Sequence, residues 1–291
     1  MTKSSPPGMG EIATSPARRL GPEDAAIFET FVVPRYLTMF GERLLEMLAA
    51  GSDARVCHLH CRTGYPDRAL VDRLPNAEVY GSDVSVHAIE LAKAKAAALP
   101  KGGTMGTFDY RAIEGLPLPF PAGAFSHAFT LHPLAAPAER RLLFEELARI
   151  VAPRGQALVA MPLRGSFIEV ADLLRECALK NELTELTNAV EAAAQLRPTD
   201  EMFARELGNV GFEYVDVDLR TRTLRFESGR GFFEDPVTRI MLLPEFRVNL
   251  GMGEGVEKHF SYVRDAIDKY WSDGTFELTV NVGVVSGRRK P

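Results

Sequence analysis

The sequence predicts an α/β fold in which a doubly wound sheet of mostly parallel strands lies between helices. Residues 54–59 form an apolar run, followed by a tight turn, a helical pattern over 65–74 and a second strand over 78–82 that ends at Asp83. Further apolar strands and helical segments alternate beyond it, which is typical of a parallel sheet covered by helices. Residues 276–285 alternate between apolar and other positions, which predicts a long last strand over 274–287.

The remaining elements follow from periodicity and from turn residues. Residues 84–99 predict a helix capped by Ser85 and ended by Gly102 and Gly103. Strands are expected at 103–110, 124–131, 156–161 and 211–224. Helices are expected at 138–151, 167–179, 198–207, 232–243 and 255–271, with a more polar helical piece between the second and third.

The N-terminal region divides into a leader and a helical segment. Residues 1–22 are rich in Ser, Pro and Gly and carry little apolar surface, so we expect a flexible leader. Residues 27–48 have helical spacing on both sides of Pro34, which predicts two helices or a kinked pair. We expect 23–291 to form a single domain, with 225–273 as a helical insertion before the last strand.

Composition limits the classes of partner and the compartment. The chain of 291 residues has a net charge of -5, which does not favour nucleic acid as a partner. Three cysteines do not form a disulfide framework and indicate a reducing compartment. Because no apolar run is long enough for a signal peptide or a membrane span, a cytoplasmic location without membrane insertion is expected.

The most informative motif is the loop at residues 56–64, Val-Cys-His-Leu-His-Cys-Arg-Thr-Gly. It stands where a βαβ unit usually carries a glycine-rich nucleotide loop, in which glycine lets the backbone approach the ligand closely. An acid at the end of the next strand, here Asp83, accepts ribose hydroxyls in such units. A bulky residue in the loop either strains the turn or projects into the ligand volume, and Arg62 is the largest.

This arrangement resembles the opening of class I S-adenosylmethionine-dependent methyltransferases, whose loop usually reads Val-Leu-Asp-Leu-Gly-Cys-Gly-Thr-Gly. Residues 118–126, Leu-Pro-Phe-Pro-Ala-Gly-Ala-Phe-Ser, are similar to that family's Leu-Pro-Phe-Pro-Asp-Gly-Ser-Phe-Asp. Residues 131–134 resemble its Leu-His-His-Leu, and residues 152–155 resemble its Leu-Lys-Pro-Gly-Gly turn. The resemblance covers residues 27–290 and is strongest from 54 to 162.

The resemblance implies a Rossmann-like sheet of seven strands with an antiparallel last strand, and S-adenosylmethionine as the cofactor. It implies O- or N-methylation of a small molecule or a protein. The residues that it places at the cofactor are His58, His60, Cys61, Arg62, Thr63, Gly64, Asp83, Val84, Glu114 and Leu131. It places Asp83 at the ribose, Glu114 near the adenine and His132 as a candidate catalytic base.

The chain departs from that family's loop at three positions. His58 stands in place of the acid, and His60 and Arg62 replace two glycines. Arg62 has two alternative roles, since its guanidinium can pair with the methionine carboxylate of the cofactor or can block the cleft. The departures also support a second hypothesis, a catalytically inactive methyltransferase-fold protein that serves as a binding, regulatory or scaffold module, with the insertion at 225–273 as a surface for a protein partner.

Other interpretations are less favoured. An oxidoreductase requires Gly-x-Gly-x-x-Gly, which this loop does not supply. Cys57, His58, His60 and Cys61 suggest a metal site, but side chains alternate along a strand, so we expect no metal. Asp83 has a structural alternative as a helix-capping acid, and His132 has one as a cleft residue without a chemical role. Tyr36 and Tyr65 are candidate rim residues.

Overall fold

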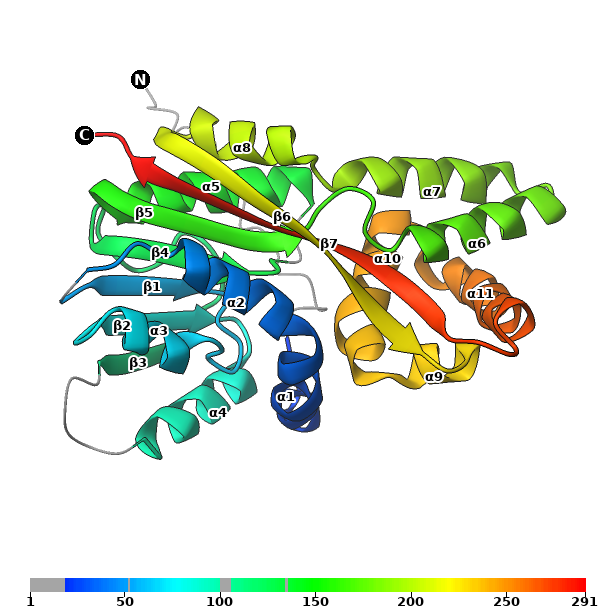
Figure 1. Cartoon of the computed structure of the whole chain (residues 1–291), viewed down its shortest axis with the longest axis horizontal. Coiled ribbons are helices and arrows are strands. Elements are labelled where there is room, and N and C mark those ends of the chain that lie inside the picture. Colours follow the sequence, from blue (N-terminus) through cyan, green and yellow to red (C-terminus); the bar gives the residue numbers. More distant parts are fainter. Residues whose placement is uncertain (1–18, 52, 100–105, 134–135) are drawn as a thin grey trace, which may run out of the picture.

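The computed structural model describes residues 19–51, 53–99, 106–133 and 136–291. Its centre is a seven-stranded sheet with the order β3-β2-β1-β4-β5-β7-β6 (Figure 1). Neighbouring strands from β3 to β5 pair in parallel, and β7 is antiparallel to both β5 and β6. The predicted doubly wound fold with a reversed last strand is therefore confirmed.

The strands agree closely with the predicted segments. They are β1 (Arg55–Leu59), β2 (Glu78–Asp83), β3 (Thr107–Ala112), β4 (Phe125–Leu131), β5 (Val151–Pro162), β6 (Phe212–Phe226) and β7 (Phe276–Arg289). The predicted start of the third strand, at residue 103, lies outside the described residues, as do the two glycines expected to end the preceding helix. β5 begins five residues earlier than the predicted residue 156.

Helices cover both faces of this sheet. They are α1 (Pro22–Ile27), α2 (Thr38–Met47), α3 (Asp67–Arg73), α4 (Val86–Ala97), α5 (Pro137–Ile150) and α8 (Asp200–Asn209). Successive side chains of a strand point to opposite faces of the sheet, so the sheet separates two hydrophobic cores. Val56 and Phe129 belong to the core with α2 and α3, and Cys57 and Ala128 belong to the core with α5 and α8.

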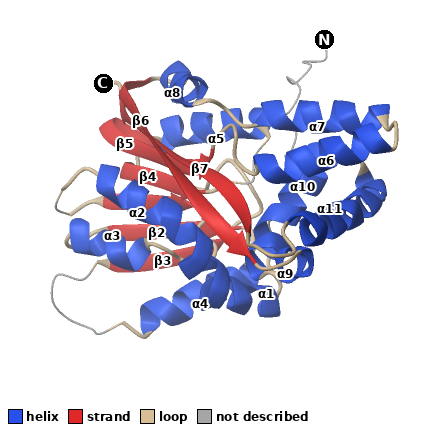
Figure 2. Ribbon diagram, turned by 45° about the vertical axis from the view of Figure 1, so that its right-hand side comes forward, coloured by secondary structure: helices blue, strands red, loops and turns tan. Residues whose placement is uncertain are grey.

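The remaining helices form a lobe beyond the sheet, where β6 and β7 extend past the other strands (Figures 1 and 2). They are α6 (Ile168–Lys180), α7 (Thr184–Leu196), α9 (Gly229–Glu234), the π-helix η3 (Thr238–Leu242), α10 (Leu243–Leu250), the 3-10 helix η4 (Gly253–Val256) and α11 (Glu257–Tyr270). Aromatic contacts tie the lobe to the strands, because Phe232 packs against Phe226 of β6 and Phe276 of β7 at ring-centre distances of 5.1 and 5.5 Å.

The prediction of one helix over 232–243 is wrong. α9 ends at Glu234, and the next residue, Asp235, is extended because Pro236 follows it. The side chain of Asp235 then accepts a hydrogen bond from the N–H of Val237 at 2.8 Å, so a new helical segment begins there.

The helical segment at the N-terminus continues through Pro34. Residues 28–37 form the π-helix η2 (Phe28–Leu37) between α1 and α2, so Pro34 changes the hydrogen-bonding register rather than separating two helices. Most of the predicted leader, residues 1–18, lies outside the described residues. Within its described end Leu20 is buried, and its carbonyl accepts a hydrogen bond from Ser85 Oγ at 2.8 Å.

Candidate functional site

The loop that follows β1 lies where the carboxyl ends of β1, β2 and β4 meet, which is the ligand-binding edge of such sheets. His60, Arg62 and Gly64 have φ angles of 52°, 48° and 81°, in the left-handed region that glycine adopts most easily. The loop therefore keeps a glycine-like backbone although two of its three left-handed residues carry side chains. Each such residue costs about 1–2 kcal/mol in this conformation, so the surrounding contacts must hold the loop in place.

Asp83 supplies the main contact to this loop. Its Oδ2 accepts a hydrogen bond from the Arg62 N–H at 3.0 Å, and its Oδ1 accepts one from the Ser85 N–H at 2.8 Å. The residue is only 3% exposed, and burial raises the pKa of its carboxyl group while the backbone hydrogen bonds oppose that rise. Asp83 thus stands at the predicted position and also fixes both the loop and the start of α4, where Ser85 is the N-cap.

The side chain of Arg62 crosses from this loop to the end of β4. Its guanidinium donates hydrogen bonds to the carbonyl oxygens of Leu131 and His132, both at 2.8 Å. It also lies 5.6 Å from the ring centre of Phe28, and the residue is 9% exposed. The space between Asp83 and the end of β4 is therefore filled by Arg62.

His58 belongs to a second buried contact, behind the loop. Its Nδ1 lies 2.7 Å from Asp67 Oδ1, and Tyr110 donates a hydrogen bond to Asp67 Oδ2 at 2.9 Å. The His58 ring stacks on Phe129 with ring centres 4.2 Å apart. A Cβ on Gly64 would lie 2.8 Å from the Tyr110 hydroxyl, so this glycine is required by Tyr110. Asp67 is not among the predicted site residues. Its position in the first turn of α3, directly after the loop, is the feature of the sequence that could have indicated it.

The other predicted cofactor residues differ in exposure. Cys61, Thr63, Val84 and Leu131 are buried, and His60 is partly buried. Glu114 is exposed and follows Ile113, whose N–H donates to the Asp83 carbonyl at 2.9 Å. Among the described residues no three His, Cys, Asp or Glu side chains form a group that could hold a metal ion.

His132 lies in a polar cluster, defined here as the buried residues Tyr36 and His132 with the partly buried residues Arg197 and Glu245. His132 Nε2 is 3.5 Å from Glu245 Oε2, and Arg197 donates to Glu245 Oε1 at 2.7 Å. The aromatic ring of Tyr36 meets the His132 ring edge-on at 5.5 Å. No local pattern in the sequence indicates Arg197 or Glu245, because Arg197 follows α7 and Glu245 lies in the first turn of α10, both in the lobe.

The charges of the polar cluster depend on burial and on each other. Burial lowers the pKa of His132, which favours the neutral imidazole near pH 7. Burial alone would raise the pKa of Glu245, but the charge of Arg197 and the contact with His132 lower it to about 2. The pKa of Tyr36 is raised by burial and then by Glu245. Glu245 is thus an ionised carboxylate beside a neutral histidine.

Several polar atoms of this cluster have unused hydrogen-bonding capacity. In the described part of the chain, Tyr36 Oη, His132 Nδ1 and Arg197 Nε are buried and make no hydrogen bond. Buried polar groups are normally satisfied, so such atoms mark a place where a polar ligand group or water completes the set. The cluster adjoins Arg62, since the carbonyl of His132 accepts one of the Arg62 hydrogen bonds.

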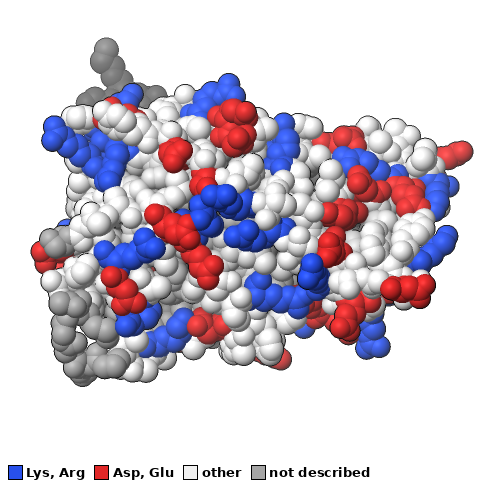
Figure 3. Space-filling model, in the orientation of Figure 1, with Lys and Arg blue, Asp and Glu red and all other residues white. Residues whose placement is uncertain are grey.

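None of the described helices has the length and apolar character needed to cross a membrane. On the face of the molecule in Figure 3, acidic and basic side chains are interspersed over the sheet domain and the lobe.

Comparison with known proteins agrees with this fold. Residues 56–155 match the family model described as a methyltransferase domain. The YcgJ protein of Bacillus subtilis superposes with a TM-score of 0.53 at 12% identity, over 87% of this chain and 99% of that one. A putative methyltransferase from Bacillus halodurans gives 0.52 at 13% identity, over 86% and 98%.

A third solved structure is phosphoethanolamine N-methyltransferase 2 of Haemonchus contortus, in complex with phosphomonomethylethanolamine and S-adenosylhomocysteine. It superposes with a TM-score of 0.54 at 12% identity, over 94% of this chain and 59% of that one. No curated protein sequence matches the chain. The family match falls on the segment that carries the loop, Asp83 and His132. Residues 56–155 therefore match a methyltransferase domain, and the seven-stranded sheet with its antiparallel β7 is the fold that this chain shares with these solved structures.

Proposed function

We propose that this protein is an S-adenosylmethionine-dependent methyltransferase that acts on the oxygen or nitrogen of a small molecule or a protein. The observation that carries the proposal is Asp83, a buried acid at the end of β2 that directly contacts the loop after β1. The match of residues 56–155 to a methyltransferase domain supports it. The Haemonchus contortus enzyme of similar fold, which is bound to S-adenosylhomocysteine, supports the choice of cofactor.

The residues of the cleft suit the cofactor except for the side chain of Arg62. Asp83 offers carboxylate oxygens for ribose hydroxyls, and the loop offers backbone groups. The guanidinium of Arg62 fills the space toward β4, so it must leave for the cofactor to enter. The amino group of the cofactor is a cation suited to the carbonyl oxygens of Leu131 and His132 that Arg62 now uses.

The bound cofactor supplies a methyl group on a positively charged sulfur. The protein positions the acceptor and excludes water from it, and both depend on the burial of the cleft. His132 serves as the proton acceptor. Ionised Glu245, whose Oε2 lies 3.5 Å from His132 Nε2, attracts the ring proton to Nε2, which leaves the lone pair of Nδ1 to take a proton from the attacking oxygen or nitrogen.

The helical insertion covers this site in our proposal. Glu245, which lies in the predicted insertion at 225–273, contacts His132 at the end of β4. The lobe thus contributes a charged side chain next to the candidate base, which suits a lid over the acceptor. A surface for a protein partner on the outside of the lobe, and a cytoplasmic location, stay predictions.

A second candidate is a methyltransferase-fold protein without catalytic activity. One observation favours it, namely that the guanidinium of Arg62 is anchored on two carbonyl oxygens inside the cofactor cleft. In that case the protein acts as a binding or regulatory module and does not take the cofactor.

Calorimetric titration of the wild-type protein with S-adenosylmethionine and S-adenosylhomocysteine separates the two candidates. If the protein is a methyltransferase, both ligands should bind saturably with micromolar dissociation constants, which correspond to about -8 kcal/mol. ATP, which shares only the adenosine group with them, is the control and should not bind. No heat and no thermal shift with either ligand at millimolar concentration would overturn the proposed activity and favour the inactive module.

A further inference from the structure

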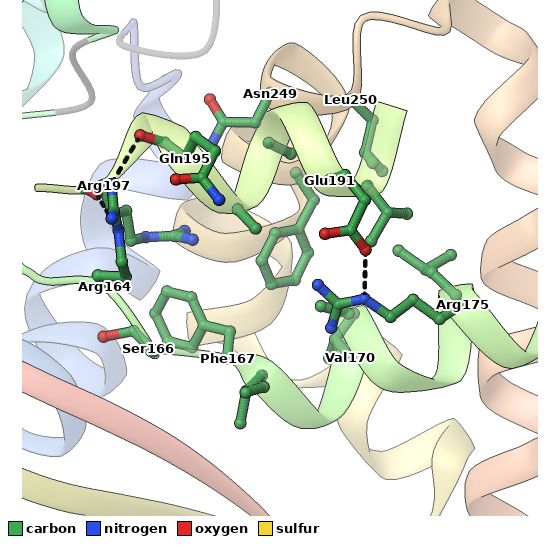
Figure 4. A pocket seen from close by; sticks show the side chains of 18 residues that line it. Arg164, Ser166, Phe167, Val170, Arg175, Glu191, Gln195, Arg197, Asn249 and Leu250 are labelled. Carbon is green, nitrogen blue, oxygen red and sulfur yellow. Dashed lines mark hydrogen bonds and ion pairs between the residues drawn. The ribbon is translucent and has the colours of Figure 1, made fainter. Parts of the chain in front are cut away.

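A cavity in the helical lobe lies apart from the cofactor cleft. It has a volume of about 230 Å³ and is lined by α6, α7, α10 and the segment before α6 (Figure 4). Its lining contains neither the loop at 60–64 nor Asp83. The apolar part of its wall is formed by Phe167, Val170, Leu174, Val190, Phe246 and Leu250. Since an apolar cavity of about 150 Å³ accommodates benzene, this one admits a single ring or a chain of medium length.

The polar groups of the cavity are arranged unevenly. At one end, Arg175 forms ion pairs with Glu191 at 2.7 Å and with Asp172 at 2.8 Å, so its charge is compensated. Arg197 is compensated by Glu245 at 2.7 Å. Arg164, at the end away from the Arg175–Glu191 pair in Figure 4, makes no ion pair within the described residues.

The contacts of Arg164 leave its charge available. Its guanidinium donates to the carbonyl oxygens of Arg197 and Gln195 at 3.3 and 3.4 Å, and it approaches the sulfur of Met202 at 3.8 Å. Neutral carbonyl oxygens orient the guanidinium but do not neutralise it. A carboxylate is the group that matches both the charge and the planar donor geometry of an arginine.

We propose that this cavity binds an amphipathic monocarboxylate, with its apolar body against the Phe167–Phe246 pair and Leu250 and its carboxylate on Arg164. At the other end of the cavity the charges of Arg175 and Glu191 compensate each other, so the ligand needs no second charged group there. The site does not depend on the proposed methyl transfer, because the residues that form it lie outside the cofactor cleft. Arg197 lines the cavity and also binds Glu245, so it is the side chain through which the two sites are in contact.

Calorimetric titration of the full chain with octanoate tests the proposal, with octylamine as a ligand of equal length and opposite charge. We expect octanoate to bind and octylamine not to bind. Arg164→Met should weaken octanoate binding about tenfold or more, which is the loss expected for one charge-assisted hydrogen-bonded contact. Arg175→Met is the matched control and should leave the affinity within about threefold, because the charge of Arg175 is already paired.

A second variant covers the case in which Arg164→Met does not fold, since Arg164 also holds carbonyls at the end of α7. Ala171→Phe fills the cavity and leaves Arg164 in place, so it should abolish octanoate binding in a folded protein. Circular dichroism and the melting temperature establish folding. Equal affinities for octanoate and octylamine, no octanoate binding to folded wild type, or unchanged binding in folded Ala171→Phe would each overturn the proposal.

Discussion

At the scale of single residues, Arg62 fills the space between Asp83 and the end of β4, where we propose that the cofactor binds. It adopts a left-handed backbone at φ 48°, and Asp83 holds its N–H while its side chain reaches the end of β4. The sequence left pairing with the cofactor and occlusion as alternatives. The structure favours occlusion in the free protein, since the donors of the guanidinium are already bound to the protein's own carbonyl oxygens.

Asp83 has a structural role that is measurable without any ligand. Asp83→Asn replaces one acceptor oxygen by an amide group that faces a backbone N–H donor, so the variant should lose about 1–3 kcal/mol of unfolding free energy. Urea denaturation checks this. Asp72→Asn, on the exposed side of α3, is the control and should change stability by less than about 0.5 kcal/mol. An Asp83→Asn protein as stable as the wild type would contradict the role of Asp83 in holding the loop.

At the scale of elements, an ion pair between a buried arginine and a partly buried glutamate joins two helices on one face of the sheet. Arg140 of α5 is 1% exposed and donates to both oxygens of Glu206 on α8, at 2.7 and 2.8 Å. Its third contact is the carbonyl of Leu196 at the end of α7, at 3.2 Å. This side chain therefore connects α5 to α7 and α8, two consecutive helices that lie much later in the sequence.

Removal of Glu206 should be costly because it leaves the buried guanidinium without a counterion. We expect Glu206→Ala to lower the unfolding free energy by about 3 kcal/mol. Glu145→Ala removes the exposed partner of Arg141 on the same α5 helix and should cost less than about 0.5 kcal/mol. Denaturant titration of both variants gives the comparison, and equal losses would refute the assignment of Arg140 as a buried structural cation.

Helices and strands were predictable from the sequence where residues within or next to each element determine it. Strand periodicity and Ser85 as a cap predicted most strands and helices along the chain, and the seven-stranded sheet with its reversed last strand followed from the family resemblance. The continuous passage through Pro34 was not predictable from proline's usual effect, because a π-helical register accommodates it. The break after α9 depends on Asp235 and Pro236, whose local geometry competes with the apolar periodicity around them.

At the scale of the whole molecule, buried histidines make stability depend on pH. Burial lowers the pKa of His127, His132 and His259 from the usual 6.5. The unfolded chain therefore binds more protons than the folded one as the pH falls below about 6.5, and stability decreases in that direction. Above pH 6.5 these groups are neutral in both states, so their contribution is fully present there.

Urea denaturation at pH 7.5, 6.5 and 5.5 should show a falling unfolding free energy. His132→Gln should reduce the slope, whereas His87→Gln, at an exposed position on α4, should leave the slope unchanged. Stability that rises toward pH 5.5, or equal slopes in the wild type and His132→Gln, would contradict the burial of a neutral His132.

The polar cluster shows where sequence reasoning ends. His132 directly follows β4, as the apolar strand before it indicated, and its role as a catalytic base stays a prediction. Its partners Tyr36, Arg197 and Glu245 come from the N-terminal helical segment and from the lobe, and only the tertiary fold brings them together. No spacing along the chain encodes that contact.

The most direct measurement of the central claim compares S-adenosylmethionine binding by the wild type and by Arg62→Gly. Glycine suits the left-handed φ at this position and removes the side chain that fills the cleft. The account predicts that both proteins bind, with Arg62→Gly tighter by about tenfold or more because no charged hydrogen bonds to Leu131 and His132 have to be released. Absence of binding in both proteins, or tighter binding by the wild type, would contradict it.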